Sequence, residues 1–201
     1  MPRKRNSSSR RMHTTLTIWD MDETLFHTTA KIVVKSNNQI LKRLTNKEFN
    51  NYRLKIGEEF DFSEFTSARH FYETSRPIRR TLQKAKNILK YVKQYPDNKM
   101  IILTARSDFD DKDMFLNTFR KYEFDIDSVY VERAGNLKFG GAAKNKRFII
   151  SKYLKQEQYT KVRLFDDSPV IIKMFKELAH QHPSICFEAY LVNSDGSYVK
   201  Q

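Results

Sequence analysis

The run Thr14-Thr-Leu-Thr-Ile-Trp19, followed at once by Asp20-Met-Asp22-Glu-Thr24-Leu-Phe26, is the strongest indication of the fold. Its first half is short, β-branched and apolar, which is typical of a buried parallel strand. Two carboxylates, Asp20 and Asp22, then stand where that strand ends. Because side chains project from a sheet at a strand end, Asp20 is a candidate nucleophile, and Asp22 on the following turn is a candidate general acid and base.

Further apolar runs predict strands at residues 99–103, 128–131, 162–165 and 187–192. Between them, the helical period predicts helices over 77–95, 109–122, 143–156 and 169–180, with Pro77 in the first turn of one and Ser168 capping another. The acidic run 107–113 is interpreted as a capped helix start rather than a second metal site. This alternation predicts an α/β fold: a Rossmann-like open, mostly parallel sheet with helices on both faces and ligands at the carboxyl ends of its strands.

Residues 28–75 interrupt the alternation and are too long for a simple βα loop. We therefore expect a small cap or lid insertion there, within a core made of residues 14–27 and 76–201. Lys31–Lys35 and Gln39–Lys42 around Asn37-Asn38 predict a hairpin, and residues 58–62 predict another strand. The aromatic residues of the insertion form its own small core or stack on a base of the substrate; they are Phe49, Tyr52, Phe60, Phe62, Phe65, Phe71 and Tyr72.

The composition is strongly basic. Thirty-seven Lys and Arg against 24 Asp and Glu give the 201-residue chain a net charge of +13, which favours encounter with polyanions such as nucleic acid or phosphorylated small molecules. Residues 1–13 are expected to be a disordered basic arm. The chain shows neither the apolar region of a secretory signal nor a transmembrane stretch, so we expect a cytoplasmic protein with no membrane partner. The single cysteine, Cys186, is expected to be buried as a small hydrophobic side chain. Composition leaves the oligomeric state open.

A second strand end carries Thr104-Ala105-Arg106. The Thr104 hydroxyl and the N–H of Ala105 are candidate ligands of a phosphoryl oxygen, and Arg106 is a candidate supporting residue. Farther along, Lys144 and Lys146 stand at a helix start, where a lysine can neutralise both a phosphate and a nucleophilic carboxylate. We favour Lys146, and Lys144 stays open as the alternative.

A third strand end carries Asp166 and Asp167. Hard oxygen ligands there, together with Asp20, suit Mg²⁺ with retained waters, and we include Asp22 in the predicted metal site. Asp167 is either a direct ligand or a support for the ligands. Without a cation, carboxylates crowded at one sheet edge would repel each other, and one would take up a proton.

These motifs, in this order and at these strand ends, resemble the haloacid dehalogenase (HAD) superfamily of aspartate-based phosphatases. The resemblance covers about residues 16–192 without the insertion. It implies magnesium and an aspartyl-phosphate on Asp20, with Asp22 as acid and base, Thr104 on phosphate, Lys146 as the stabilising lysine and Asp166 on the metal. Asp22 points away from the dehalogenase branch, which lacks this second aspartate.

The predicted function is hydrolysis of a phosphate monoester on a nucleotide or a nucleic-acid end. The motifs look similar to those of the phosphatase half of polynucleotide kinase-phosphatases, and the compact build resembles small HAD proteins of phages. No kinase-type Gly-rich phosphate loop is present. Two alternatives remain: a sugar-phosphate or phosphoprotein phosphatase, and a non-catalytic nucleic-acid-binding or assembly protein on the same scaffold.

Overall fold

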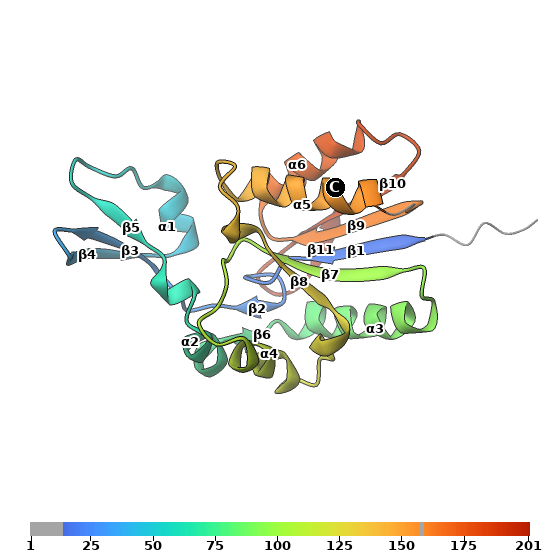
Figure 1. Cartoon of the computed structure of the whole chain (residues 1–201), viewed down its shortest axis with the longest axis horizontal. Helices are drawn as coiled ribbons and strands as arrows, with labels where there is room; N and C mark the ends of the chain where they lie inside the picture. The colour runs from blue at the N-terminus through green and yellow to red at the C-terminus, as the bar shows by residue number, and fades with distance from the viewer. Residues whose placement is uncertain (1–13, 157–158) are drawn as a thin grey trace, which may run out of the picture.

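The computed structural model describes residues 14–156 and 159–201, so the predicted arm 1–13 lies outside the described residues. Six strands form the main sheet in the order β11-β10-β9-β1-β7-β8 (Figure 1). Their bounds are β1 Thr15–Trp19, β7 Lys99–Thr104, β8 Tyr130–Arg133, β9 Lys161–Asp166, β10 Cys186–Val192 and β11 Tyr198–Lys200. All neighbours pair in parallel except β10 and β11. The predicted α/β fold with an open, mostly parallel sheet is confirmed.

Helices cover both faces of this sheet. Helices α5 (Ala142–Gln156) and α6 (Pro169–Ala179) lie on one face, and α3 (Arg79–Gln94) and α4 (Lys112–Arg120) lie on the other (Figure 1). Strand β1 lies between β9 and β7, and its side chains alternate between the two faces of the sheet. Leu16 and Ile18 pack in the apolar layer beneath α5 and α6, and Trp19 packs in the layer beneath α3 and α4. Burial on both faces explains why β1 reads as a continuous apolar run. Among the described residues, no helix has the length and apolar character needed to cross a membrane.

Two predicted details of the helix starts are wrong. Pro77 does not begin a helix: it lies in the short strand β6 (Arg76–Pro77), which pairs with β2 (Phe26–His27), and α3 starts only at Arg79. Ser168 occupies the N-cap position of α6, but its side chain makes no capping hydrogen bond. Its backbone N–H instead donates to Asp166 Oδ1 at 2.9 Å, so the turn serves the carboxylate rather than the helix.

The acidic run 107–113 and Cys186 were also assigned from their local sequence, the first correctly and the second not. The acidic run does begin a helix, because the Asp111 side chain accepts a hydrogen bond from the Met114 N–H at the start of α4. Cys186, by contrast, is exposed, so the expectation of a buried hydrophobe is wrong. It is the first residue of β10 and precedes the part of the strand that packs on α6.

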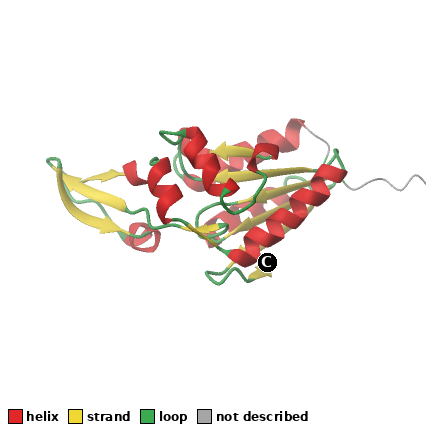
Figure 2. Ribbon diagram, turned by 90° about the horizontal axis from the view of Figure 1, so that it is seen from below, coloured by secondary structure: helices red, strands yellow, loops and turns green. Residues whose placement is uncertain are grey.

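Residues 32–61 form a separate three-stranded sheet, hereafter the small sheet, in the order β4-β3-β5. Its strands are β3 Ile32–Ser36, β4 Gln39–Leu44 and β5 Glu59–Asp61. The predicted hairpin is confirmed: Asn37 and Asn38 both have positive φ (49° and 62°), which asparagine tolerates in a tight hairpin turn. Figure 2 shows the small sheet projecting from one end of the molecule.

Helix α1 (Asn46–Asn51) and a 3₁₀ turn (Ser63–Phe65) contact the small sheet, and helix α2 (Ala68–Thr74) follows and packs on α4. Most of the predicted aromatic residues pack on its buried Ile32, Val34 and Leu44; these are Phe49, Tyr52, Phe60 and Phe65. Phe71 of α2 instead joins the apolar layer beneath α4. The end of the 28–75 segment therefore packs on the main body of the protein.

Candidate active site

Three carboxylates meet where β1 and β9 end. The strands pair in parallel with Trp19 opposite Phe165, and the Asp20 N–H donates to the Phe165 carbonyl at 2.9 Å. This register places Asp20 beside Asp166 and Asp167, and one carboxylate oxygen of each lies within 4.8 Å of those of the other two. Asp20 and Asp166 are buried and Asp167 is half-buried. This oxygen-only group is a donor set that suits a small hard cation such as Mg²⁺.

Lys146 closes the group from α5. Its Nζ donates to Asp20 Oδ1 at 2.6 Å and to Asp166 Oδ2 at 2.8 Å, and its side chain is 3% exposed. Lys144 is exposed to solvent on the same helix. Of the two lysines left open by the sequence, the structure therefore brings Lys146 to Asp20 and leaves Lys144 outside.

The start of α5 is held by a residue that the sequence reasoning missed. The Asn145 side chain donates to the carbonyls of Ala134 and Leu137 at 2.9 and 2.8 Å and accepts from the Phe139 N–H at 3.1 Å. These bonds tie the loop after β8 to the first turn of the helix, next to Lys146. Its position between the two candidate lysines was the available signal, but an asparagine in a helix has no distinctive pattern.

Burial and mutual repulsion control the ionisation of this group. Burial raises the pKa of Asp20 most strongly; the Lys146 charge opposes this effect, and the neighbouring carboxylates reinforce it, so the pKa stays well above its usual range. Burial and Asp166 together raise the pKa of Asp167 to about 7. For Lys146, burial lowers the pKa, but Asp166 and Asp20 outweigh it and raise the pKa above that of an ordinary lysine. Lys146 therefore stays charged.

Asp22 was included in the predicted metal site, but it lies outside the group of Asp20, Asp166 and Asp167 because Arg106 holds its side chain. Arg106 Nε donates to Asp22 Oδ2 at 2.9 Å and Nη2 donates to Oδ1 at 2.6 Å. The same guanidinium donates to the Thr28 hydroxyl at 2.8 Å and to the Phe65 carbonyl at 3.0 Å. The predicted supporting residue Arg106 thus joins the candidate acid and base to both ends of the segment that carries the small sheet.

Thr104 ends β7, the other neighbour of β1, and so lies at the same edge of the sheet. It is buried, and its hydroxyl accepts from the Arg106 N–H at 3.1 Å, while Ala105 is exposed at the edge. Gly135 makes the following turn possible, because a Cβ there would lie 2.5 Å from the Ala105 carbonyl oxygen and 2.4 Å from the Ser107 nitrogen. No other residue type allows this close backbone approach.

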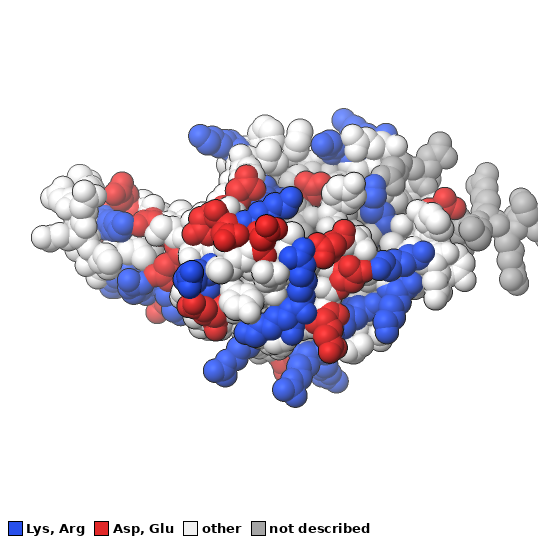
Figure 3. Space-filling model, turned by 60° about the horizontal axis from the view of Figure 1, so that its bottom comes forward, with Lys and Arg blue, Asp and Glu red and all other residues white. Residues whose placement is uncertain are grey.

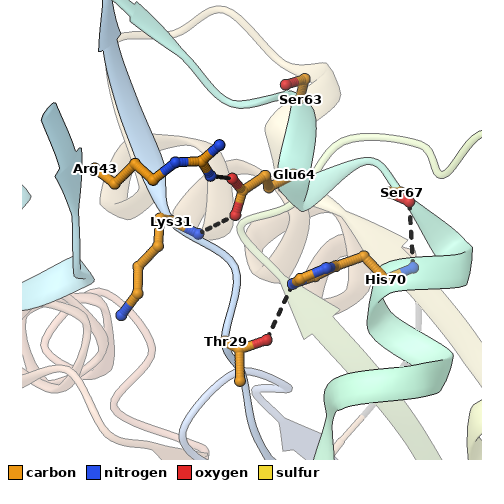
Figure 4. A pocket seen from close by; sticks show the side chains of 7 residues that line it. All are labelled: Thr29, Lys31, Arg43, Ser63, Glu64, Ser67 and His70. Atoms are coloured by element: carbon orange, nitrogen blue, oxygen red, sulfur yellow. Dashed lines mark hydrogen bonds and ion pairs between the residues drawn. The ribbon is translucent and has the colours of Figure 1, made fainter. Parts of the chain in front are cut away.

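A cavity of about 560 Å³ lies at the junction of the small sheet and the main body (Figure 4). In it, Glu64 accepts from the Lys31 N–H at 2.9 Å and pairs with Arg43, and His70 hydrogen-bonds Thr29 at 3.0 Å. None of the predicted site residues lines it. Its lining consists of Thr29, Lys31, Arg43, Ser63, Glu64, Ser67 and His70.

No protein-family model matches the chain, and no curated protein matches it. Among solved structures, the chain is similar to the HAD domain of effector protein Lem4 from Legionella pneumophila. The two are 14% identical with a TM-score of 0.48, over 89% of this chain and 85% of that domain. A similarity this distant concerns the arrangement of the backbone, so the chemistry of this chain has to follow from its own residues.

Proposed function

We propose that the protein is a magnesium-dependent phosphatase that hydrolyses a phosphate monoester through an aspartyl-phosphate on Asp20. The observation that carries this proposal is the position of Lys146, whose ammonium lies between Asp20 and Asp166 where two parallel strands end. A buried cation there neutralises the nucleophile, and it would also attract the phosphoryl group.

The proposed reaction has two steps. A carboxylate oxygen of Asp20 attacks phosphorus, the bond to the ester oxygen breaks, and Asp22 gives that oxygen its proton. Asp22 then takes a proton from a water molecule, which attacks the phosphorylated Asp20 and releases inorganic phosphate. Arg106 would hold Asp22 in place, and the Thr104 hydroxyl with the N–H of Ala105 would bind phosphoryl oxygens.

Magnesium fits the donor set of Asp20, Asp166 and Asp167, three carboxylates whose charge exceeds that of Lys146. When bound, the ion would neutralise charge on the phosphoryl group. Asp167 is proposed as a direct ligand on the strength of its place in this group. Asp22 is proposed for proton transfer alone, because its carboxylate is engaged by Arg106.

We propose a nucleotide or nucleic-acid end as the substrate, as in the phosphatase half of polynucleotide kinase-phosphatases. The net charge of +13 supports a polyanionic ligand. The segment 28–75 is proposed to act as a cap over the site, since Thr28 before the small sheet and Phe65 after it both accept hydrogen bonds from Arg106. Phe62, an aromatic residue of this segment that is 46% exposed, is proposed to stack on a base.

Release of phosphate by wild type, Asp20→Asn and the matched control Asp97→Asn tests the proposal. The substrates are nucleoside monophosphates, 3′-phosphorylated oligonucleotides, sugar phosphates and phosphopeptides, each with and without Mg²⁺. We expect Mg²⁺-dependent release by wild type and the control, with Asp20→Asn reduced by at least about 10³-fold. Activity of Asp20→Asn equal to wild type would exclude Asp20 as nucleophile, and silence of wild type across the panel would favour the non-catalytic binding protein.

A further inference from the structure

Helix α3 carries cations along its exposed side and no acidic residue anywhere in its sequence, RRTLQKAKNILKYVKQ. Its apolar residues Leu82, Ala85 and Leu89 are buried beneath the main sheet. The cations that flank and oppose this buried side are hereafter the α3 basic face; they are Arg79, Arg80, Lys84, Lys90, Lys93 and the half-buried Lys86. Figure 3 shows Lys and Arg side chains gathered along the lower part of the molecule, on the side of the main sheet that α3 covers.

Carboxylates from neighbouring loops pair with only part of this face. Arg80 lies 3.5 Å from Asp195, Lys86 lies 3.8 Å from Glu123, and Lys93 pairs with Asp125. Among the described residues, Arg79, Lys84 and Lys90 have no carboxylate at ion-pair distance. These three cations leave the helix surface with positive charge that can attract a polyanion.

The α3 basic face adjoins the candidate active site through β2 and β6. Glu23 follows Asp20 by three residues, and its Oε2 lies 2.9 Å from His27 Nδ1. His27 in turn pairs with Arg76 between β2 and β6. Arg76 precedes Arg79 by three residues. A cavity of about 670 Å³ lies beside this pair, lined by His27, Thr29, Glu73, Thr74, Ser75, Arg76, Lys121 and Tyr122.

We propose that the α3 basic face binds the sugar–phosphate backbone of a nucleic-acid strand whose phosphorylated end lies at Asp20. The inference rests on the proposed function and extends it from the strand end to the strand. Arg79 and Lys90 are eleven residues apart, about 16 Å along a helix, which corresponds to about five nucleotides of one strand. The strand would run from the cavity beside Arg76 along α3.

An aromatic pair at the far end of the helix favours nucleic acid over a lipid surface. Tyr91 and Tyr95 are 55% and 38% exposed, and their ring centroids lie 4.5 Å apart. Exposed aromatic rings beside cations are the elements that bind single strands by stacking. A helix that binds a membrane surface instead needs an outward apolar face, and the apolar side of α3 is already buried.

The test uses a fluorescent twelve-nucleotide strand without a terminal phosphate, so that binding is measured apart from turnover. The variant Arg79→Ala/Lys84→Ala/Lys90→Ala is compared with the control Lys152→Ala/Lys173→Ala/Lys176→Ala, which removes equal charge from exposed positions of α5 and α6. Alanine favours helix in both, and equal unfolding temperatures will show that both fold.

We expect the α3 variant to bind the strand at least about tenfold more weakly in 50 mM salt, with the slope of log K against log salt reduced by about 2. The control should change affinity less than about twofold. Equal losses in the two variants, or no binding by wild type, would overturn the inference. If the α3 variant lost binding to phosphatidylserine vesicles but bound the strand as wild type does, the inference would be overturned in favour of a lipid surface.

The outcome is separable from that of the proposed function. If wild type releases phosphate from small esters and the α3 variant still binds the strand, the phosphatase is supported and strand binding by the α3 basic face is refuted. If only the α3 variant loses strand binding and no substrate is turned over, strand binding by the α3 basic face is supported and the phosphatase is refuted.

Discussion

Asp20 and Asp166 at the ends of β1 and β9, with Lys146 of α5, are charged groups that are almost wholly buried, whereas the small sheet leaves nearly every side chain of β4 in solvent. In the first region, Asp20, Asp166 and Lys146 lie at hydrogen-bond distance between two fully packed layers. In the second, a core of three buried aliphatic residues is completed by half-buried aromatic rings. The first region draws its residues from β1, β9 and α5, whereas the second packs mainly on its own residues.

Arg106 is a polar link between Asp22 and the two stretches that flank the small sheet, through its contacts with Thr28 and Phe65. Its guanidinium also lies 4.8–5.4 Å from the ring centroids of Phe65, Phe71 and Phe109. The main sheet therefore builds the site, and the segment that carries the small sheet is bonded to the main body through Arg106, Glu23 and Asp110.

The largest effect is expected where burial is deepest. Lys146→Met should lower the free energy of unfolding by about 3–5 kcal/mol in metal-free buffer, because Asp20 and Asp166 would then face each other without a cation. Mg²⁺ should restore part of this loss. Urea unfolding with and without Mg²⁺ measures both, and the control Lys144→Met should stay within about 0.5 kcal/mol of wild type. Equal effects of the two substitutions would contradict the buried position of Lys146.

Removing the link should cost less and should loosen the small sheet. Arg106→Ala should destabilise by about 3 kcal/mol, since Asp22 would lose its partner. Amide hydrogen exchange should accelerate in residues 28–65. A double-mutant cycle with Asp22→Asn isolates the pair, and we expect a coupling energy of at least about 1 kcal/mol. Additive effects would mean that the two side chains do not act together.

A matched pair of core substitutions tests whether the regions unfold separately. Val34→Ala in β3 and Val162→Ala in β9 each remove two methyl groups from a side chain with 0% exposure, worth about 2 kcal/mol. Val34→Ala should accelerate hydrogen exchange in residues 32–61 alone, whereas Val162→Ala should lower global stability. A global loss from Val34→Ala would show that the small sheet and the main sheet unfold as one unit.

The smallest effect concerns pH. Because the pKa of Asp167 is raised to about 7, the folded protein holds a proton that the unfolded chain has lost between pH 4 and 7, so metal-free stability falls as pH rises through 7. Mg²⁺ requires the carboxylate, and its affinity should rise about tenfold from pH 6 to pH 8.

Trp19 offers a probe for this titration, because it precedes Asp20 and its ring stacks on Phe165 at 3.9 Å. Mg²⁺ titrations followed by tryptophan fluorescence should lose most of their pH dependence in Asp167→Asn. The control Asp108→Asn should keep it. An unchanged pH profile in Asp167→Asn would assign the titration to another group.

The predicted strands and the α3–α6 helices were found from the sequence because their signals are local. The apolar run of β1 and the Asn37-Asn38 turn each reflect the geometry of a few neighbouring residues. Pro77 misled the prediction, because pairing of β6 with β2 overrides the usual preference for proline in a first helical turn. Strand β11 and helix α2 were missed, since both are short and depend on packing against another element.

The sequence predicts without further information that Asp20, Thr104 and Asp166 share one edge of a parallel sheet, because each directly follows or ends an apolar strand. The contact of Lys146 rather than Lys144 with Asp20, and the pairing of Asp22 with Arg106, are visible only in the folded chain. These contacts join residues 126 and 84 positions apart. No local pattern encodes such distances, because they depend on the packing of α5 and of the loop after β7 against the sheet.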